Sequence, residues 1–366
     1  MSVCAIICEY NPLHRGHLWQ IRQAKQRFDA VVCIMSGSFV QRGEPAFMDK
    51  FARTRAALLS GADMVLELPV IYSLQAARYF ALGGVRIFNG LSVLSILSFG
   101  REGQSLPNIR EDALSRLKRG ESYPSAVYDA ALPNDVLAAE YIRGIEETGS
   151  DLEPFWIKRR GAHDSSGLDS ALGIRRAAAA GEDITGALPD GSAEVLKAQM
   201  ALGRAPWQED VLFRLVCARA RALSAQALSA LSGADEGLEY RLKRAAEQAA
   251  SLEELINLLK SKRYTRARIC RFLMCVLLGV EKRQTALYNT SAPPYIRCLG
   301  VRREKRDLLS LCARSSRIPF YTSGAELKRE GGELFEMEMR ATDIYELLLP
   351  KPGRGGRDMT EGLIVL

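Results

Sequence analysis

Residues 3–18 have the sequence VCAIICEYNPLHRGHL, and this stretch decides the fold. Its apolar run at 3–8 predicts a strand that is buried on both faces of a parallel sheet. A turn follows, and the spacing of apolar residues over 16–28 predicts a helix. A second apolar run at 31–35 completes a β-α-β unit, whose loops lie at the carboxyl ends of the strands.

The same alternation continues to about residue 100. We expect a helix over 50–59, a strand over 64–68, a helix over 73–82 that ends at Gly83-Gly84, and further short apolar runs at 85–88 and 93–98. This pattern predicts an α/β protein with an open, mainly parallel, Rossmann-like sheet. In such sheets ligands bind beyond the carboxyl ends of the strands, near the switch in strand order.

Beyond about residue 110 the chain becomes mainly helix-forming. Segments rich in Ala, Leu, Arg and Glu lie at 126–147, 168–181, 192–203, 208–228 and 237–260, and a short strand is expected at 318–320. A chain of 366 residues is long enough for two or three domains. We therefore expect two domains, with residues 1–185 forming the sheet and residues 186–366 forming a mainly helical region.

Two of the three histidines of the chain, His14 and His17, flank Gly16 where the first helix begins. A helix N-terminus offers unpaired N–H groups and a partial positive charge to a phosphate. Gly16 has no Cβ, so a phosphate or ribose can approach the backbone. The two imidazoles can donate hydrogen bonds to phosphate oxygens as charge builds in a transition state. A coincidental His-x-Gly-His in a turn is the alternative.

This motif, preceded by Asn11-Pro12, resembles the HIGH-type nucleotidyltransferases, which bind ATP and form adenylates. Longer blocks make the chain similar to the tRNA(Met) cytidine acetate ligase family, namely ICEYNPLHRGHL at 7–18, MSGSFVQRGEPAFMDK at 35–50 and GADMVLELP at 61–69. Shorter matching pieces lie at 98–100, 133–134, 157–159, 262–271 and 341–345. The resemblance thus covers essentially the whole chain.

The resemblance implies a two-step reaction. ATP and acetate form acetyl-adenylate and pyrophosphate, and the acetyl group then passes to N4 of the wobble cytidine, anticodon position 34, of elongator tRNA(Met). Mg²⁺ is expected to accompany ATP, because it bridges phosphate oxygens. No carboxylate cluster marks a metal cage, so we name no metal ligands. Residues 1–185 are then expected to bind ATP, and residues 186–366 to bind tRNA.

The resemblance also implies which residues form the nucleotide site, with His14 and His17 as the catalytic candidates. The implied ATP contacts are Ile7, Cys8, Glu9, Tyr10, Asn11, Pro12, Leu13, His14, Arg15, Gly16, His17, Leu18, Trp19, Gln20, Gly100, Asn134 and Arg159. Simpler roles stay open for the last three. Gly100 can be a turn glycine, Asn134 a helix N-cap, and Arg159 part of a solvated basic face, with Arg160 as the alternative contact.

Three positions depart from the family pattern. Arg15 and Ser38 stand where Asn is common, and Arg101 stands where a small residue is usual. The two arginines add positive charge near the expected phosphates. The Lys-Met-Ser-Lys-Ser-like signature of tRNA synthetases is not found, which argues against an enzyme that charges tRNA with amino acids.

The segment at 36–45, SGSFVQRGEP, predicts a long loop at the end of the second strand. Long loops at this edge commonly form binding walls or lids. We expect this loop to help hold acetate or the target base, with Gln41 and Arg42 as the polar candidates.

The net charge of +7 is concentrated in the C-terminal half, where residues 260–329 contain 17 Lys or Arg and 4 Asp or Glu. Lys260, Lys262, Arg263, Arg266, Arg268 and Arg271 are expected on one helical segment, and Arg302, Arg303, Lys305 and Arg306 form a second cluster. Such stripes bind a phosphate backbone, although a solvated face is the simpler alternative. Trp207 and Tyr264 can stack on bases or serve only in packing.

Other features place limits on the class of protein. No stretch is long and apolar enough for a transmembrane helix, and the N-terminus does not resemble a signal peptide, so a cytoplasmic location without a membrane partner is expected. No CxxC pair is present, and His163-Asp164 has no histidine nearby, so a structural metal site is not expected. No obligate protein partner is evident.

Two other functions remain open. The first is a HIGH-type nucleotidyltransferase that adenylylates another small acceptor, but this function would leave the basic helical half without a known role. An RNA-binding protein that has lost catalysis is the other, and the presence of both His14 and His17 argues against it.

Overall fold

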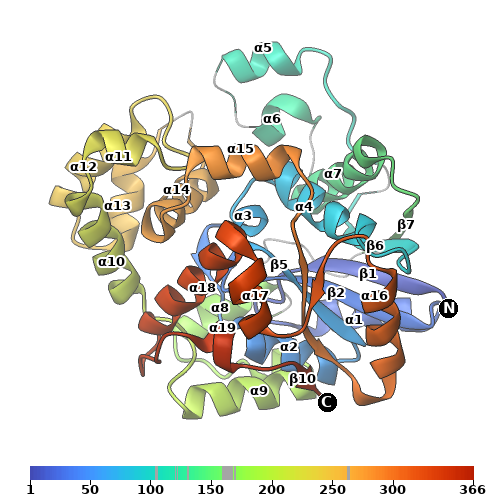
Figure 1. Cartoon of the computed structure of the whole chain (residues 1–366). Coiled ribbons are helices and arrows are strands. Elements are labelled where there is room, and N and C mark those ends of the chain that lie inside the picture. Colours follow the sequence, from blue (N-terminus) through green and yellow to red (C-terminus); the bar gives the residue numbers. More distant parts are fainter. Residues whose placement is uncertain are drawn as a thin grey trace.

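A computed structural model gives the structure of the chain (Figure 1). It describes residues 1–103, 106–119, 121, 123–129, 132–158, 168, 170–261 and 264–366. Within these residues, no helix has both the length and the apolar character needed to cross a lipid bilayer.

A mainly parallel sheet lies at the centre of the fold. Its strands follow the order β10-β8-β5-β2-β1-β6-β7, with β9 paired to β8. The bounds are β1 Val3–Cys8, β2 Ala30–Ser36, β5 Met64–Leu68, β6 Ile96–Arg101, β7 Glu153–Lys158, β8 Ile296–Val301, β9 Phe320–Tyr321 and β10 Ile364–Val365. β1 pairs in parallel with β2 on one side and with β6 on the other, whereas β8 pairs antiparallel with β5.

The loop expected at 36–45 contains a small hairpin. Its strands are β3 (Phe39–Val40) and β4 (Glu44–Pro45), which pair antiparallel and form a sheet of their own. The hairpin follows β2 directly and therefore lies at the carboxyl edge of the main sheet.

The helices of the first half connect the strands or flank them, except for two short helices at residues 113–127 that lie apart from the sheet, at the top in Figure 1. In chain order, the helices of the first half are α1 Arg15–Lys25, α2 Lys50–Leu59, α3 Val70–Ser73, α4 Ala77–Asn89, α5 Ala113–Lys118, α6 Tyr123–Val127, α7 Pro133–Thr148, α8 Ala171–Ala179, the 3₁₀ helix η1 Thr185–Ala187 and α9 Asp190–Ala201. α1 and α2 carry the crossovers between parallel strands, as the sequence pattern predicts.

The later helices form two groups. α10 Glu209–Ala222, α11 Ala225–Ser229, α12 Leu238–Gln248, α13 Leu252–Leu259 and α14 Arg266–Leu278 gather on one side of the molecule, at the left in Figure 1. The remaining helices are α15 Lys282–Thr290, η2 Arg303–Lys305, α16 Arg306–Ser315, α17 Gly324–Glu330, α18 Gly332–Leu347 and α19 Arg357–Thr360. α14 is the central helix of the first group, since its residues 272–278 are all buried.

The expected α/β class is confirmed. The strands predicted at 3–8 and 64–68 have these bounds, and the one predicted at 31–35 extends over 30–36. The expectation that a helix ends at Gly83-Gly84 is wrong, because α4 continues through both glycines to Asn89 and includes the run at 85–88. The two glycines let Tyr72 and Ile7 pack directly against the backbone of α4. A Cβ on Gly83 would lie 2.4 Å from the Tyr72 ring, and one on Gly84 would lie 2.3 Å from Ile7 Cδ1.

The C-terminal half also contributes strands to the main sheet. β8 lies beside β5, and β10 and β9 pair with β8, so residues beyond 295 close one edge of the sheet. A division of the chain into domains at residues 185 and 186 stays a prediction. Any division into domains has to assign β8, β9 and β10, which follow the α10–α14 group in sequence, to the same unit as the first strands.

A network of buried charges joins this returning segment to the N-terminal unit. Lys50 Nζ lies 2.5 Å from Glu67 Oε1 and 2.7 Å from Asp358 Oδ1, and Arg297 pairs with both carboxylates. Burial alone would raise the pKa of Asp358, but Lys50 and Arg297 lower it to about 2. The four side chains come from α2, β5, β8 and α19, so the network fastens the last helix and β8 onto the first β-α-β units.

We predict that Asp358→Asn lowers the free energy of unfolding at pH 7 by about 3–5 kcal/mol, because it leaves Lys50 and Arg297 buried with one carboxylate fewer. Since the folded pKa of Asp358 is depressed, its contribution is present above the unfolded pKa of about 3.9 and is lost as pH falls toward 2. Urea unfolding of wild type and variant between pH 7 and pH 3 measures this difference.

Asp210→Asn is the matched control, because Asp210 pairs with Arg214 at 2.9 Å with both side chains about two-thirds exposed. We expect it to change the free energy of unfolding by less than about 1 kcal/mol. Equal effects of the two substitutions would contradict a stabilising role for the buried network.

Candidate functional site

His14 and His17 form a reciprocal cap at the start of α1. His14 is the N-cap residue, and its Nδ1 accepts a hydrogen bond from the Gly16 N–H at 3.0 Å. His17 Nδ1 accepts from the His14 N–H at 3.3 Å, and the two ring centroids lie 3.9 Å apart. Because Nδ1 of each ring accepts a main-chain N–H, the proton of each neutral ring lies on Nε2. The cap therefore presents two Nε2–H donors.

A cavity of about 880 Å³ opens beside this cap, at the carboxyl ends of β1, β2 and β6. Predicted residues that line it are Ile7, Cys8, Glu9, Tyr10, Asn11, His14, Gly16, His17, Trp19, Gln20, Gly100 and Asn134. Gln20 fixes α1 against β6, since its Nε2 donates to the Ser98 carbonyl at 3.3 Å. The structure thus brings most of the expected site together around one cavity.

The other predicted contacts lie elsewhere. Arg15 and Leu18 line a second hollow between α1 and residues 186–191. Leu13 is buried in the core, where its carbonyl accepts a hydrogen bond from Ser192 Oγ at 2.9 Å. Pro12, next to it, is not among the residues that line either hollow.

Some predictions lie outside the described residues. These are the assignments of Arg159, its alternative Arg160, the His163-Asp164 pair, and Lys262 and Arg263 in the basic segment.

Gly100 and Asn134 form the wall of the cavity on the β6 side. Gly100 is the fifth residue of β6, and Asn134 lies in the first turn of α7. The alternative role of Asn134 as the cap of this helix is wrong, because Leu132 occupies the N-cap position. Asn134 Nδ2 donates instead to Glu102 Oε1, and Asp135 accepts from the Glu102 N–H at 2.9 Å.

Burial raises the pKa of several acidic side chains at the centre of the site. Burial raises the pKa of Glu9, although its carboxylate accepts a hydrogen bond from the Gln41 N–H at 2.7 Å. Burial also raises the pKa of the Cys8 thiol and of Tyr10, both of which adjoin Cys33. Cys8 and Tyr10 therefore stay neutral at physiological pH.

The hairpin of residues 36–45 forms the opposite wall, on the β2 side, where Gln41 and Arg42 line the cavity as expected. Gly43 has φ +80°, and a Cβ on it would lie 2.2 Å from the Arg271 backbone nitrogen. This close approach brings the hairpin directly against α14. Ser232, Gly233, Thr265 and Arg268 extend the wall into the helical group.

The basic segment at 260–271 does not form one helix, so that expectation is wrong. α13 ends at Leu259, α14 begins at Arg266, and Thr265 caps α14 by accepting from the Arg268 N–H at 3.3 Å. Arg266 pairs with Glu253 and Arg268 pairs with Asp235. The charge is therefore divided between local ion pairs and the cavity wall.

The two aromatic candidates for base stacking serve in packing. Tyr264 is 6% exposed, and its hydroxyl donates to the Asp235 carbonyl at 3.0 Å. Trp207 packs against the main hydrophobic core.

Comparisons with known proteins identify the family. The HIGH Nucleotidyl Transferase family model matches residues 1–358. The tRNA(Met) cytidine acetate ligase of Syntrophomonas wolfei subsp. wolfei is 35% identical, with 98% of each chain covered, and that of Acetivibrio thermocellus is 31% identical over the whole of both chains. The chain belongs to the tRNA(Met) cytidine acetate ligase family. It is thus a member of a family of ligases.

Solved structures agree with this assignment over the full length. The crystal structure of Thermotoga maritima TmcAL bound with alpha-thio ATP is 30% identical and covers all of both chains, with a TM-score of 0.92. The apo form of the same protein gives a TM-score of 0.93 at 29% identity. The helical C-terminal half therefore belongs to the family's common fold.

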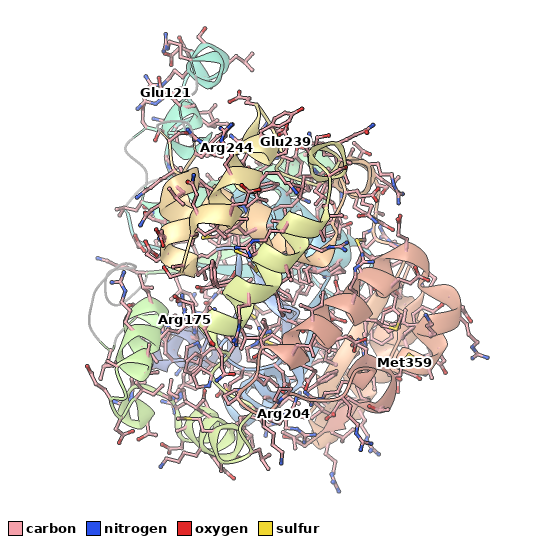
Figure 2. The ribbon with its side chains drawn as sticks, turned by 90° about the vertical axis from the view of Figure 1, so that its left-hand side faces the viewer. Glu121, Arg175, Arg204, Glu239, Arg244 and Met359 are labelled. Carbon is pink, nitrogen blue, oxygen red and sulfur yellow. The ribbon has the colours of Figure 1, made fainter. Side chains whose placement is uncertain are left out.

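Two arginines that were not predicted from the sequence hold the site in position. Arg175 of α8 donates from Nη1 to the Asn11 carbonyl at 2.7 Å and pairs with Glu44 at 2.7 Å. Figure 2 shows Arg175 beside α8, below the yellow helices. Nothing in the local sequence marks Arg175, because its partners are more than a hundred residues away.

Arg53 is the second, and it is fully buried on α2. It donates to the carbonyls of Glu9 at 2.6 Å and Met48 at 2.9 Å, and to the carbonyl of Gly37. It thereby joins the end of β1 to both ends of the hairpin segment. A sequence signal was present, since Arg53 interrupts the apolar face of the predicted helix at 50–59.

We predict that Arg53→Lys lowers the free energy of unfolding by about 2–4 kcal/mol, because an ammonium group cannot reach all three buried carbonyls and each unpaired one costs about 1–3 kcal/mol. Arg55→Lys, two residues along the same helix, is the control. The Arg55 side chain is 44% exposed and pairs with Glu361 at 3.3 Å, so we expect less than about 1 kcal/mol. Urea unfolding measures both variants, and similar losses would refute the bridging role of Arg53.

Proposed function

We propose that this protein uses ATP to activate acetate as acetyl-adenylate and transfers the acetyl group to N4 of the wobble cytidine of elongator tRNA(Met). The observation that carries the proposal is the pair of capping histidines at the wall of a large cavity, in a chain of this family. The capped helix start supplies what a polyphosphate needs, namely main-chain N–H groups, a partial positive charge and two imidazole donors.

The proposed ATP orientation follows from the sheet. The α-phosphate would lie at the Gly16 turn, and the adenosine would lie toward Gly100 and Asn134 on the β6 side, where strand order reverses. The full-length relative from Thermotoga maritima, crystallised with alpha-thio ATP, supports a nucleotide site in this fold. Arg159 stays a proposed contact.

The acceptors would then occupy the other side of the cavity, beside the hairpin. An acetate oxygen attacks the α-phosphorus, the bond to the β-phosphate oxygen breaks, and pyrophosphate leaves. The cytidine N4 then attacks the acetyl carbonyl, the bond to the adenylate oxygen breaks, and AMP leaves with loss of one N4 proton. In the first step the His14 and His17 Nε2–H groups stabilise charge on phosphate oxygens, while Gln41 and Arg42 contact the acetate or the base.

Mg²⁺ is proposed to enter with ATP. The described residues contain no group of three or more His, Cys, Asp or Glu side chains that could hold a metal ion. Phosphate oxygens and water are therefore the proposed ligands, as is usual for this ion.

Pyrophosphate exchange tests the proposal. We predict that wild type incorporates labelled pyrophosphate into ATP only when acetate is present, and that His17→Ala lowers this exchange by about 10²–10³-fold through loss of one oxyanion donor. Gln26→Ala, at the exposed end of α1, is the control and should retain exchange within about two-fold.

The second step is tested by acetyl transfer from labelled acetate to elongator tRNA(Met), with a tRNA that lacks cytidine at position 34 as the control. Exchange that proceeds without acetate would indicate adenylylation of another small acceptor. Complete absence of exchange would leave an RNA-binding protein without catalysis.

A further inference from the structure

Arg271 is a positively charged side chain in the wall of the cavity. It lies on α14, is half-buried, and donates from Nη1 to the Gln41 carbonyl at 3.1 Å. Among the residues that the structure describes, no Asp or Glu forms an ion pair with it. A guanidinium has five N–H donors, so this one hydrogen bond leaves most of its capacity available for a ligand.

Two other arginines that line the same cavity are paired with carboxylates. Arg175 pairs with Glu44 at 2.7 Å, and Arg268 pairs with Asp235 at 3.2 Å. Burial lowers the pKa of Arg271 to about 10, so the group stays protonated at neutral pH despite a cost in desolvation. A half-buried charge with no counter-ion favours the binding of an anion, and a guanidinium suits the two oxygens of a phosphate.

Arg271 lies on the side of the cavity where the acceptors are proposed to bind. The Gly43 turn contacts the Cys270–Arg271 backbone, so the hairpin and α14 are held together at this point. The hairpin follows β2, whereas Gly100 and Asn134 lie on the β6 side, and β1 runs between them. Arg271 therefore lies across the cavity from the proposed adenosine position.

We propose that Arg271 binds a backbone phosphate of the RNA strand beside the nucleotide that enters the cavity. The proposal rests on the proposed function and assigns one anchor for its RNA substrate. Arg268 lies one turn earlier on α14 and lines the same cavity, so the two arginines follow one another along its wall. A phosphodiester chain that follows them would bring one base toward the hairpin.

Acetate is the alternative anion for this group. Its carboxylate has to lie about 3–3.5 Å from the α-phosphorus, which is proposed to lie at the start of α1. A phosphate of the RNA strand is not bound by this distance and can lie on the wall that Arg271 shares with the hairpin.

The test compares Arg271→Gln and Arg271→Lys with the control Arg214→Gln, which alters an exposed arginine of α10 that pairs with Asp210. Each variant is assayed for acetate-dependent pyrophosphate exchange, for the KM of elongator tRNA(Met) in acetyl transfer, and for equilibrium tRNA binding at several salt concentrations. Thermal unfolding shows whether each variant is folded, and Arg271→Lys retains the charge if Arg271→Gln does not fold.

We expect Arg271→Gln to leave exchange within two-fold of wild type and to raise the KM for tRNA at least ten-fold. The slope of log binding constant against log salt should become shallower by about 0.7, the value for one single-stranded phosphate contact. Arg271→Lys should keep the wild-type slope with a smaller loss of affinity, and the control should match wild type.

Other results would overturn the proposal. A raised KM for acetate in exchange, with tRNA binding unchanged, would assign Arg271 to acetate, and no change in either assay would give it no ligand. If wild type shows no acetate-dependent exchange, the proposed function fails. The salt dependence of tRNA binding would still decide the role of Arg271, because binding does not require catalysis.

Discussion

The site depends on one constraint, which is that β1 has parallel neighbours on both sides. Because β1, β2 and β6 run in the same direction, their following segments leave the sheet at one edge. The capping histidines follow β1, the hairpin follows β2, and Gly100 lies next to the last residue of β6. Three segments that are far apart in sequence therefore enclose one cavity, with the N-terminus of α1 directed into it.

The C-terminal half completes this arrangement from two directions. The buried charges of Lys50, Glu67, Arg297 and Asp358 hold β8 and α19 against the first β-α-β units, far along the sheet from β6. From the other side, α14 places its first turns against the hairpin. The α10–α14 group, which lies beside the sheet, thus forms a wall of the cavity. This agrees with a family match that extends over nearly the full length of the chain.

Local patterns predicted the parts of the fold that local physics determines. The apolar runs at 3–8 and 64–68 gave strands with correct bounds, and the His-x-Gly-His motif gave the cap. Predictions failed where contacts with distant residues determine the local structure. One example is α4, which continues over Gly83 and Gly84 because these glycines pack against Tyr72 and Ile7. The basic segment at 260–271 suggested one charged helix, yet only the fold separates the paired Arg266 and Arg268 from Arg271, whose hydrogen-bond partner is 230 residues away. Arg175 was missed for the same reason, since its partners Asn11 and Glu44 are more than a hundred residues away.

The central claim is that acetate is activated by attack on the α-phosphorus of ATP at the histidine cap. Transfer from [¹⁸O₂]acetate to elongator tRNA(Met), followed by mass spectrometry of the released nucleotide, tests it most directly. Acetyl-adenylate formation makes an acetate oxygen the bridge to phosphorus, and transfer leaves that oxygen on the phosphate. The account predicts AMP that carries one ¹⁸O atom for each acetyl group transferred. Unlabelled AMP, or release of ADP in place of AMP, would contradict it.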